Sequence, residues 1–297
     1  MIVDGANLRT LGTGFGVSFR NGMGRATSQW DRVATTVPSS TKSTEYGWLG
    51  QLPRVREWVG DREVQNLETH GYTIKNRPWE MTIGVDRDEI ADDNVGMYGP
   101  LFEEMGYATQ IFPDELVFPM LAAGFSTNCY DGQYFFDADH PVRGADGVVA
   151  SVSNTGGGSG TPWYLLSTMR PLKPIIFQSR RAFDFTAMDK PDDEQVFSAK
   201  KFRYGVDGRC NVGFGFWQLA YGSKQTLDAT SYAAARAAMM SMKGDYGRPL
   251  GIVPNLLVVP PSLEGAAKDI LVVERNAAGA TNKWQNTAEL LTVPWLA

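Results

Sequence analysis

The residue types that could carry out chemistry gather in one stretch, FSTNCYDGQYFFDADHPV at residues 125–142. It contains one of only two histidines in the chain, together with a cysteine and three aspartates: His140, Cys129, Asp131, Asp137 and Asp139. Imidazole, thiolate and carboxylate groups are the protein ligands of divalent metal ions, and a metal-bound water is a strong nucleophile. One hypothesis is therefore a metal-dependent hydrolase that uses Asp137, Asp139 and His140.

The same stretch also has a structural interpretation. Adjacent side chains converge on one ion only when a fixed loop presents them, and catalytic metal sites usually add ligands from distant segments. Aspartates cap turns through hydrogen bonds to nearby backbone, and the residue before Pro141 is held in an extended conformation. We therefore favour a turn over a metal site, and we predict no catalytic residue, no metal and no cofactor. The other histidine, His70, lies in a polar turn and is expected to be solvated or at an interface.

Motifs of other enzyme classes are absent from the sequence. It has no H-E-x-x-H pattern, no Walker phosphate loop and no C-x-x-C pair. The segment GTGFG at residues 12–16 lacks the third glycine and the preceding strand of a dinucleotide-binding loop. The segment GGGSG at residues 156–160 does not fit the nucleophile elbow of hydrolases. The stretch around His140 is therefore the main candidate for a catalytic site in this sequence.

The composition is that of a folded chain. Its 297 residues are 43% hydrophobic, which suits one large domain or two modest ones. A formal net charge of −5 argues against a dedicated nucleic-acid binder, which needs a basic surface to neutralise phosphates. Two cysteines, Cys129 and Cys210, are too few for a disulfide framework and favour a reducing compartment. The sequence shows no apolar run long enough for a membrane span and no secretory signal pattern, so we expect a cytosolic product.

Two segments have compositions typical of contact with a neighbouring chain. Residues 1–24 contain six glycines among apolar side chains, which predicts either a flexible tail or an arm that becomes ordered against a neighbour. Residues 45–86 mix charges of both signs with aromatic rings, as interface anchors do, and have strand-like ends. The candidate inter-subunit residues are Phe15, Phe19, Trp48, Arg54, Arg56, Trp58, Asp61, Arg62, His70, Tyr72 and Trp79.

The middle of the chain has mixed signals. Apolar residues recur at helical spacing from Leu101 to Phe112, and Pro113 is expected to kink or restart that helix. Thr161 and Pro162 predict a short helix over WYLLST at residues 163–168. Residues 173–185 and 199–206 alternate as strands do.

The last third gives the clearest pattern. Alanine-rich residues 228–243 predict a helix that is capped at Thr230 or Ser231 and ends at Gly244. One face of this helix is expected to be buried, namely Tyr232, Ala235, Met239 and Met242. Residues 255–271 read as a buried strand and a helix capped by Ser262, and a final strand follows. The order of elements predicts an α+β protein.

Four long segments resemble the Mu-like phage major head subunit family, gpT. They are EYGWLGQLPRVREWVGDREVQNLETHGYTIKNRPWEMTIGVDRDEIADD, DELVFPMLAAGFSTNCYDGQYFFDADHPV, KFRYGVDGRCNVGFGFWQLAYGS and GIVPNLLVVPPSLEGAAKDIL. The resemblance covers essentially the whole chain, and the segments are long and unusual in composition.

The resemblance implies the Hong Kong 97 (HK97) type of capsid fold. Residues 1–44 would form the N-terminal arm and the entry to the peripheral domain, residues 45–86 the extended loop, and residues 87–124 the spine helix. Residues 125–172 would connect to the axial domain and form part of it. Residues 173–222 would supply the long strands of the peripheral domain, and residues 223–297 the axial core and C-terminal strand.

The resemblance also implies a structural function, so we predict that the protein is not an enzyme. The expected role is a major capsid protein that assembles with itself into hexamers and pentamers of an icosahedral shell around double-stranded DNA, without sequence-specific binding. Separate scaffold, protease, portal and minor capsid or decoration proteins would be partners, and the virion, assembled in the bacterial cytoplasm, would be its location. An alternative function is the shell protein of an encapsulin-like cellular nanocompartment, because such shells share the fold. The enclosed cargo would distinguish the two: double-stranded DNA for a phage head and an enzyme for a compartment.

Overall fold

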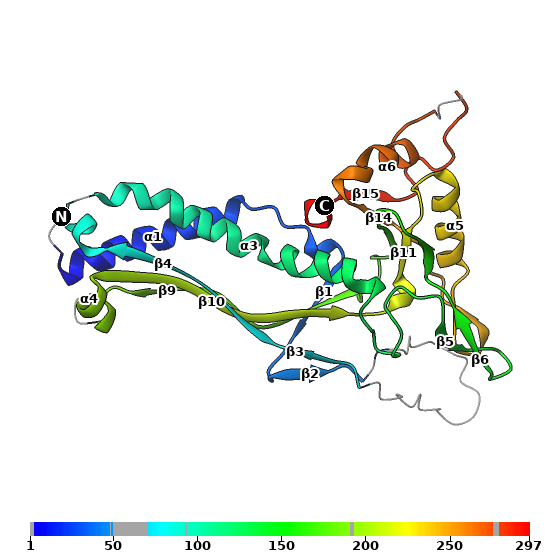
Figure 1. Ribbon diagram of the computed structural model, residues 1–297, viewed down its shortest axis with the longest axis horizontal. Coiled ribbons are helices and arrows are strands. Elements are labelled where there is room, and N and C mark those ends of the chain that lie inside the picture. Colours follow the sequence, from blue (N-terminus) through cyan, green and yellow to red (C-terminus); the bar gives the residue numbers. More distant parts are fainter. Residues whose placement is uncertain (1–2, 48, 50–70, 93, 191–192, 276–278) are drawn as a thin grey trace.

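The computed structural model describes residues 3–47, 49, 71–92, 94–190, 193–275 and 279–297. These residues form an elongated lobe and a smaller lobe at one end of it (Figure 1). The long lobe contains helices α1 (Gly5–Arg25) and α3 (Gly99–Ala122) beside a four-stranded sheet. The small lobe contains a five-stranded sheet with helices α5 (Ala229–Met240) and α6 (Glu264–Leu271). The mixture of helices with two separate sheets is the α+β class that the sequence predicts.

The sheet of the long lobe has the order β1-β9-β10-β4. Its strands are β1 (Ala34–Pro38), β9 (Ile175–Met188), β10 (Lys201–Phe214) and β4 (Arg77–Asp86). β10 runs antiparallel to both β9 and β4, and β1 is parallel to β9. Along β10, Phe202, Tyr204 and Val206 are buried between exposed or half-buried neighbours, which is the alternation of a sheet with one covered face. Helix α4 (Glu194–Ala199) connects β9 to β10. Its C-cap residue is Lys200, which adopts the left-handed conformation with φ 54°.

Helices α1 and α3 cross in very close contact. A Cβ placed on Gly22 would lie 1.8 Å from the carbonyl oxygen of Glu103, and one on Gly106 would lie 1.9 Å from that of Phe19. Only glycine fits at either point, because each backbone rests directly on the other helix. Around the crossing, Phe15, Phe19 and Phe102 pack with neighbours from β9 and β10 in a separate core cluster of the long lobe.

The structure corrects two predictions for the long lobe. The glycine-rich residues 5–25 form a helix of the subunit's own body, capped by Asp4, and do not extend as an arm. Phe15 and Phe19 are buried against their own chain, so they do not present an inter-subunit surface. The second correction concerns α3, which continues through Pro113 and Pro119 as one helix. Its buried face includes Phe102 at 0% exposure, whereas Leu101, which the sequence pattern selects, is 46% exposed.

A buried carboxylate joins α3 to the segment that leads into β1. The Asp114 carboxylate accepts hydrogen bonds from the backbone N–H groups of Gln29 and Trp30, with its Oδ1 at 2.9 Å and 2.6 Å. Burial raises the pKa of Asp114, while these two hydrogen bonds act in the opposite direction. Asp114 therefore fixes the position at which the chain enters the sheet.

The sheet of the small lobe has the order β15-β14-β8-β11-β7. Its strands are β7 (Thr155–Gly158), β8 (Trp163–Leu166), β11 (Ala220–Lys224), β14 (Leu256–Val259) and β15 (Glu289–Thr292). All four residues of β8 and all four of β14 are buried, because both faces of these central strands are covered. Helix α5 contacts β7 and β11, and α6 contacts β14 and β15. The predicted helix over residues 163–168 is therefore wrong, since this segment is a central strand.

The other predictions for the small lobe are partly confirmed. Tyr232, Ala235 and Met239 are buried as the helical pattern of α5 predicts. The helix ends at Met240 and not at Gly244, so Met242, which is also buried, lies beyond it. The cap is Asp228, whose Oδ1 accepts from the N–H groups of Thr230 and Ser231, each at 2.8 Å. The strand and helix predicted over residues 255–271 are present as β14 and α6, but α6 has Leu263 as N-cap, with no side-chain hydrogen bond. The expected final strand is β15.

Shorter elements complete the described chain. The remaining strands are β2 (Ser43–Glu45), β3 (Thr73–Lys75), β5 (His140–Arg143), β6 (Val149–Val152), β12 (Lys243–Gly244) and β13 (Arg248–Pro249). A short α-helix, α2 (Arg87–Ala91), precedes α3, and the 3-10 helices are η1 (Trp30–Arg32), η2 (Asn94–Tyr98), η3 (Ala123–Phe125), η4 (Trp217–Leu219), η5 (Asp245–Gly247), η6 (Pro261–Leu263) and η7 (Pro294–Leu296). β2 pairs antiparallel with β3, so residues 46–72 leave and rejoin the body at neighbouring positions.

Candidate functional site

The chemically rich stretch lies where the chain leaves the long lobe for the small lobe. Helix α3 ends in η3, residues 126–139 turn back on themselves, and His140 begins β5. Phe135 stacks on Phe214 at the end of β10, with ring centroids 4.3 Å apart. Phe136 lies 5.5 Å from Tyr164 of β8, centroid to centroid. These rings tie the turn to the sheets of both lobes.

His140 is completely buried at 0% exposure, within its own subunit. Its ring stacks on Trp217 of η4, with centroids 3.9 Å apart and planes 8° from parallel. Its Nδ1 lies 2.7 Å from Asp131 Oδ2, and its Nε2 lies 3.2 Å from Asn154 Oδ1. Both ring nitrogens therefore have polar partners. His140 is a buried residue of its own subunit and does not lie on the surface.

The residues that could hold a metal ion differ from those of the hydrolase hypothesis. Within the described ranges, the Cys129 thiol, the Asp131 carboxylate and the His140 imidazole place one ligand atom each within 4.8 Å of one another. Asp131 Oδ1 accepts from the Cys129 thiol at 3.0 Å and from the Gln133 N–H at 3.1 Å. Burial, with the nearby Asp131 charge, raises the pKa of Cys129 far above its ordinary value, so the thiol stays protonated. In this arrangement the thiol acts as a hydrogen-bond donor to the Asp131 carboxylate.

Asp137 and Asp139 do not converge with His140 on a common point. The carboxylate of Asp137 accepts from the backbone N–H of Tyr134 at 3.2 Å and from that of Ala138 at 2.7 Å. It therefore caps its own turn, as the structural interpretation of the sequence predicts. Asp139 is exposed.

Sequence reasoning does not identify the partners that complete this cluster. Asn154 and Trp217 come from segments far along the chain and carry no local motif. The orientation of Asn154 is fixed by its contacts: its Nδ2 donates to the carbonyl oxygens of Phe135 and Trp217, at 2.7 Å and 3.2 Å. Its Oδ1 accepts from the N–H of Asp137 at 2.9 Å.

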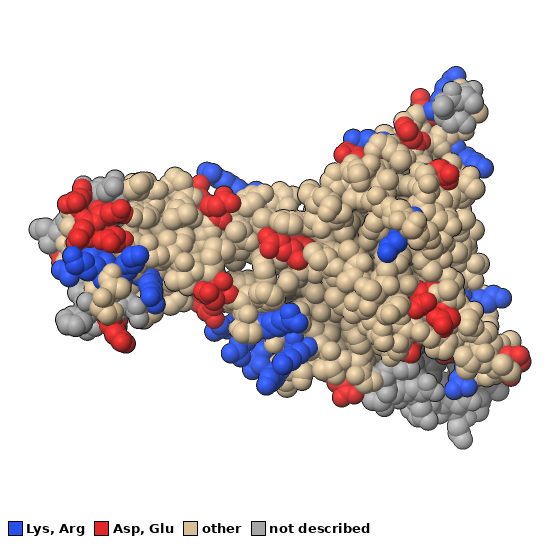
Figure 2. All heavy atoms as spheres, viewed as in Figure 1, with Lys and Arg blue, Asp and Glu red and all other residues tan. Residues whose placement is uncertain are grey.

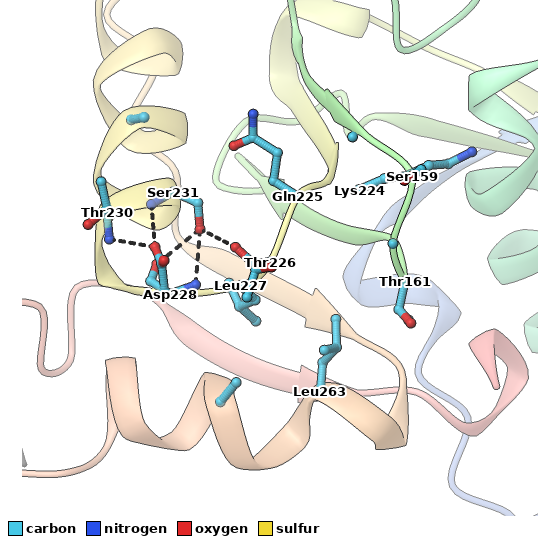
Figure 3. Close-up of a pocket in the computed structure, with 14 residues that line it drawn as sticks. Ser159, Thr161, Lys224, Gln225, Thr226, Leu227, Asp228, Thr230, Ser231 and Leu263 are labelled. Atoms are coloured by element: carbon cyan, nitrogen blue, oxygen red, sulfur yellow. Dashed lines mark hydrogen bonds between the residues drawn. The ribbon is translucent and has the colours of Figure 1, made fainter.

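A surface pocket of about 840 Å³ lies in the small lobe between the first turn of α5, the turn from β7 to β8 and the start of α6 (Figure 3). Its lining includes Thr161, Lys224 and Leu263. The Asp228 carboxylate accepts hydrogen bonds from the backbone N–H groups of Thr230 and Ser231 in the first turn of α5. These hydrogen bonds, of which the one from Ser231 has the largest effect, lower the pKa of Asp228. The helix N-terminus is thus occupied by a fixed negative charge, which opposes binding of an anion there.

The predicted inter-subunit residues have different positions. Trp48, Arg54, Arg56, Trp58, Asp61, Arg62 and His70 lie outside the described residues. Tyr72 is half-buried, its hydroxyl accepts from the Phe214 N–H at 2.7 Å, and burial raises its pKa to about 12. Trp79 is also half-buried, and its indole N–H donates to the Cys210 carbonyl at 3.1 Å. These two aromatic residues therefore make contacts within their own subunit, which leaves only part of each ring for a neighbour.

The surface carries charge in separate groups. On the face shown in Figure 2, both signs gather at the free end of the long lobe, and basic side chains cluster below its middle. Within the long sheet, Arg209 of β10 stands opposite Arg181 of β9, and Arg181 forms an ion pair with Asp207. In the part of the chain that the structure describes, no helix combines the length and apolar character needed to cross a bilayer.

Comparison with known proteins gives a consistent result along the whole chain. The family model described as Mu-like prophage major head subunit gpT matches residues 8–296. The chain is 47% identical over 277 residues to the Mu-like prophage FluMu major head subunit of Haemophilus influenzae, with 91% of this chain and 90% of the relative covered. It is 41% identical over 305 residues to the major capsid protein of Escherichia phage Mu, with 100% of both covered.

Solved structures of phage heads show the same fold. A chain of the procapsid of bacteriophage JBD30 matches with a TM-score of 0.88 and 47% identity, covering 99% of this chain and 100% of that one. The JBD30 capsid decorated with minor capsid protein trimers matches with a TM-score of 0.77 and 36% identity, over 93% of each chain.

Proposed function

This chain belongs to the family of Mu-like prophage major head subunits, gpT, and it is a phage capsid protein with the HK97-like fold; from this premise we propose how it builds a head. Copies of the chain assemble with one another into hexamers and pentamers that close an icosahedral shell. The observation that carries the proposal is the match to the JBD30 procapsid chain along 99% of this chain at a TM-score of 0.88. Members of this family are structural proteins and not enzymes, as the sequence predicts.

The two lobes give the proposal a geometric basis. The long lobe, with α3 beside its four-stranded sheet, is the proposed peripheral domain, and the small lobe is the proposed axial domain around the capsomer axes. Residues 46–72 begin and end next to each other at β2 and β3, as expected of an extended loop that reaches a neighbouring subunit. The base of this loop is firmly held, since the Tyr46 hydroxyl donates to Gln178 Oε1 at 2.8 Å inside the core.

We propose that the shell encloses double-stranded DNA without recognising its sequence. The chain carries 33 acidic and 28 basic residues, a formal net charge of −5. A net acidic wall does not bind phosphates tightly, which leaves enclosed DNA free to be packed and released. Particles would then contain nuclease-protected DNA, whereas a nanocompartment would contain a cargo protein. The names of the relatives favour neither the compartment nor the hydrolase hypothesis.

Partners of the shell belong to the same proposal. The JBD30 capsid is decorated with minor capsid protein trimers. We expect this shell to bind a comparable minor or decoration protein, and to assemble in the bacterial cytoplasm with separate scaffold, protease and portal proteins before it becomes part of the virion.

The extended loop provides a specific test. Trp58→Ala is expected to reduce the yield of closed shells more than it lowers the melting temperature of the unassembled subunit, because interface aromatics contribute to binding and not to the subunit's own core. Trp163→Ala is the matched control: Trp163 is fully buried in β8, so its loss should lower the melting temperature strongly. If Trp58→Ala lowers the melting temperature as much as Trp163→Ala does, Trp58 belongs to the subunit core and the loop assignment is wrong.

A further inference from the structure

A buried glutamine lies between the two ends of the loop formed by residues 46–72. Gln178 is in β9, between β1 and β10 of the long sheet, and its side chain is completely buried. Its Oε1 accepts from the Tyr46 hydroxyl at 2.8 Å, next to the end of β2. Its Nε2 donates to the carbonyl oxygen of Ile74 in β3 at 3.1 Å, and to Asn76 Oδ1 at 2.8 Å. One side chain therefore holds both ends of the loop on a central strand.

The orientation of this amide is fixed by its partners. A backbone carbonyl can only accept, so the Gln178 group that faces the Ile74 carbonyl must be the NH2 group. The Oε1 atom then faces Tyr46, whose hydroxyl donates. Burial raises the pKa of Tyr46 to about 12, so this hydroxyl keeps its proton at neutral pH. Both N–H groups and the carbonyl oxygen of the Gln178 amide are thus satisfied.

The hydrogen bonds continue from Gln178 to a third segment. Asn76 Nδ2 donates to Ser39 Oγ at 2.9 Å and to the Thr41 carbonyl oxygen at 2.8 Å. The Asn76 N–H donates to the Lys42 carbonyl oxygen at 2.9 Å. All three acceptors lie in the turn between β1 and β2. We call this series of hydrogen bonds the Gln178 relay, and it joins β9, this turn and both ends of the loop.

Subunit stability alone does not explain a polar residue at this position. The ribbon of β2 and β3 projects from one side of the long sheet (Figure 1) and pairs over only three residues of each strand. Such a ribbon is marginal by itself, so it depends on its anchor. An apolar side chain could fill the same space, whereas a buried amide costs free energy unless all its groups are paired. A fully satisfied network holds one geometry, because any other leaves groups unpaired.

We propose that Gln178 is a positioning residue for assembly: it fixes the direction in which residues 46–72 leave the body, and thereby the angle between neighbouring subunits. The inference rests on the proposed function of this loop as a contact with a neighbouring copy. Head-to-tail contacts close a ring only at the correct rotation between copies, and another rotation gives open assemblies. A loop whose base can tilt therefore produces particles of mixed curvature.

The first test uses unassembled full-length subunits. Gln178→Leu keeps a side chain of similar size and removes all three hydrogen bonds. Hydrogen exchange at the N–H groups of Tyr46 and Asn76, which donate to backbone carbonyls at the base of the loop, should become at least roughly tenfold faster. The control is Val258→Ala, at a fully buried residue of the small lobe, which should leave both rates unchanged. Unchanged exchange in Gln178→Leu would overturn the proposal.

The second test examines particles formed with the scaffold by electron microscopy. Gln178→Leu should replace closed shells of wild-type diameter by open and irregular particles. Val258→Ala destabilises the subunit away from the loop, so its particles should keep the wild-type diameter. The same distribution of particle shapes in both variants would show that Gln178 contributes only stability. Tyr46→Phe, which removes one hydroxyl of the relay, gives the same comparison if Gln178→Leu does not fold.

The wild-type chain separates this inference from the proposed function. If the wild type forms closed shells and Gln178→Leu forms the same shells, the positioning role is wrong and the proposed function stands. If the wild type forms no shells, the proposed function is wrong, and the positioning role fails with it.

Discussion

The crossing of α1 and α3 predicts an unusual result for a glycine-to-alanine substitution. In a helix interior, replacing glycine by alanine ordinarily stabilises by about 1 kcal/mol. At Gly106, however, the new methyl group would lie 1.9 Å from the Phe19 carbonyl oxygen and 2.8 Å from its carbon. This is about 1.5 Å short of the 3.4 Å at which ordinary contact begins, and the obstacle is backbone, which cannot rotate away. The two helices must separate to accommodate it.

The size of the effect follows from the packing around this crossing. Separation would loosen the contacts of Phe15, Phe19 and Phe102, which lie in one core cluster where Phe15 stacks on Phe102. Overpacking of a close-packed core costs about 1–3 kcal/mol. Gly106→Ala should therefore lower the free energy of unfolding by about 1–3 kcal/mol, opposite in sign to its helix propensity.

Gly14 on α1 provides the matched control. It is also in a helix interior, but no heavy atom lies within 4 Å of its Cβ position. Gly14→Ala should raise the free energy of unfolding by up to about 1 kcal/mol, so the two variants should differ by about 1–4 kcal/mol. Urea unfolding of unassembled subunits, followed by tryptophan fluorescence, measures both. The reasoning is refuted if Gly106→Ala is as stable as Gly14→Ala.

Three further predictions concern stability. Asp114→Ala should lower the free energy of unfolding by about 1–3 kcal/mol, because the N–H groups of two half-buried residues lose their acceptor. The exposed neighbour Glu115→Ala should change it little, and urea unfolding compares the two variants. Phe102→Ala should cost about 3–5 kcal/mol and the exposed Leu101→Ala far less, in the same assay; similar losses would contradict the buried face assigned to α3. Because the folded-state pKa of Asp131 is lowered, its stabilisation is present above the unfolded value of about 3.9 and is lost as pH falls through the folded value. Asp131→Asn should therefore show a shallower loss of melting temperature between pH about 5 and about 2 than the wild type, and equal slopes would show that Asp131 does not contribute.

Local sequence signals predict the elements that local interactions stabilise. The buried face of α5 follows from its alanine-rich helical spacing, and its start is misplaced only because Asp228, and not Thr230 or Ser231, supplies the cap. The segment WYLL at β8 carries no such signal. Four consecutive apolar residues fit a central strand as well as a buried helix, and only the neighbouring strands β11 and β14 decide between them.

Helix α1 and the His140 cluster depend on contacts between distant segments. Six glycines in residues 1–24 argue against a helix. The helix is stabilised by contacts with distant segments: Gly22 lies directly against α3, and Phe15 and Phe19 are buried against α3 and the long strands. The sequence stretch around His140 correctly suggests a turn. Its partners Asn154 and Trp217 are brought together only by the fold, so no spacing rule could find them.

Electron cryo-microscopy of particles formed when this chain is produced together with its scaffold tests the central claim most directly. The account predicts closed icosahedral shells whose wall consists of this chain, with the small lobe around five-fold and six-fold axes and the long lobe at the periphery. Particles whose wall lacks this chain, or a wall in which the small lobe points away from those axes, would contradict it.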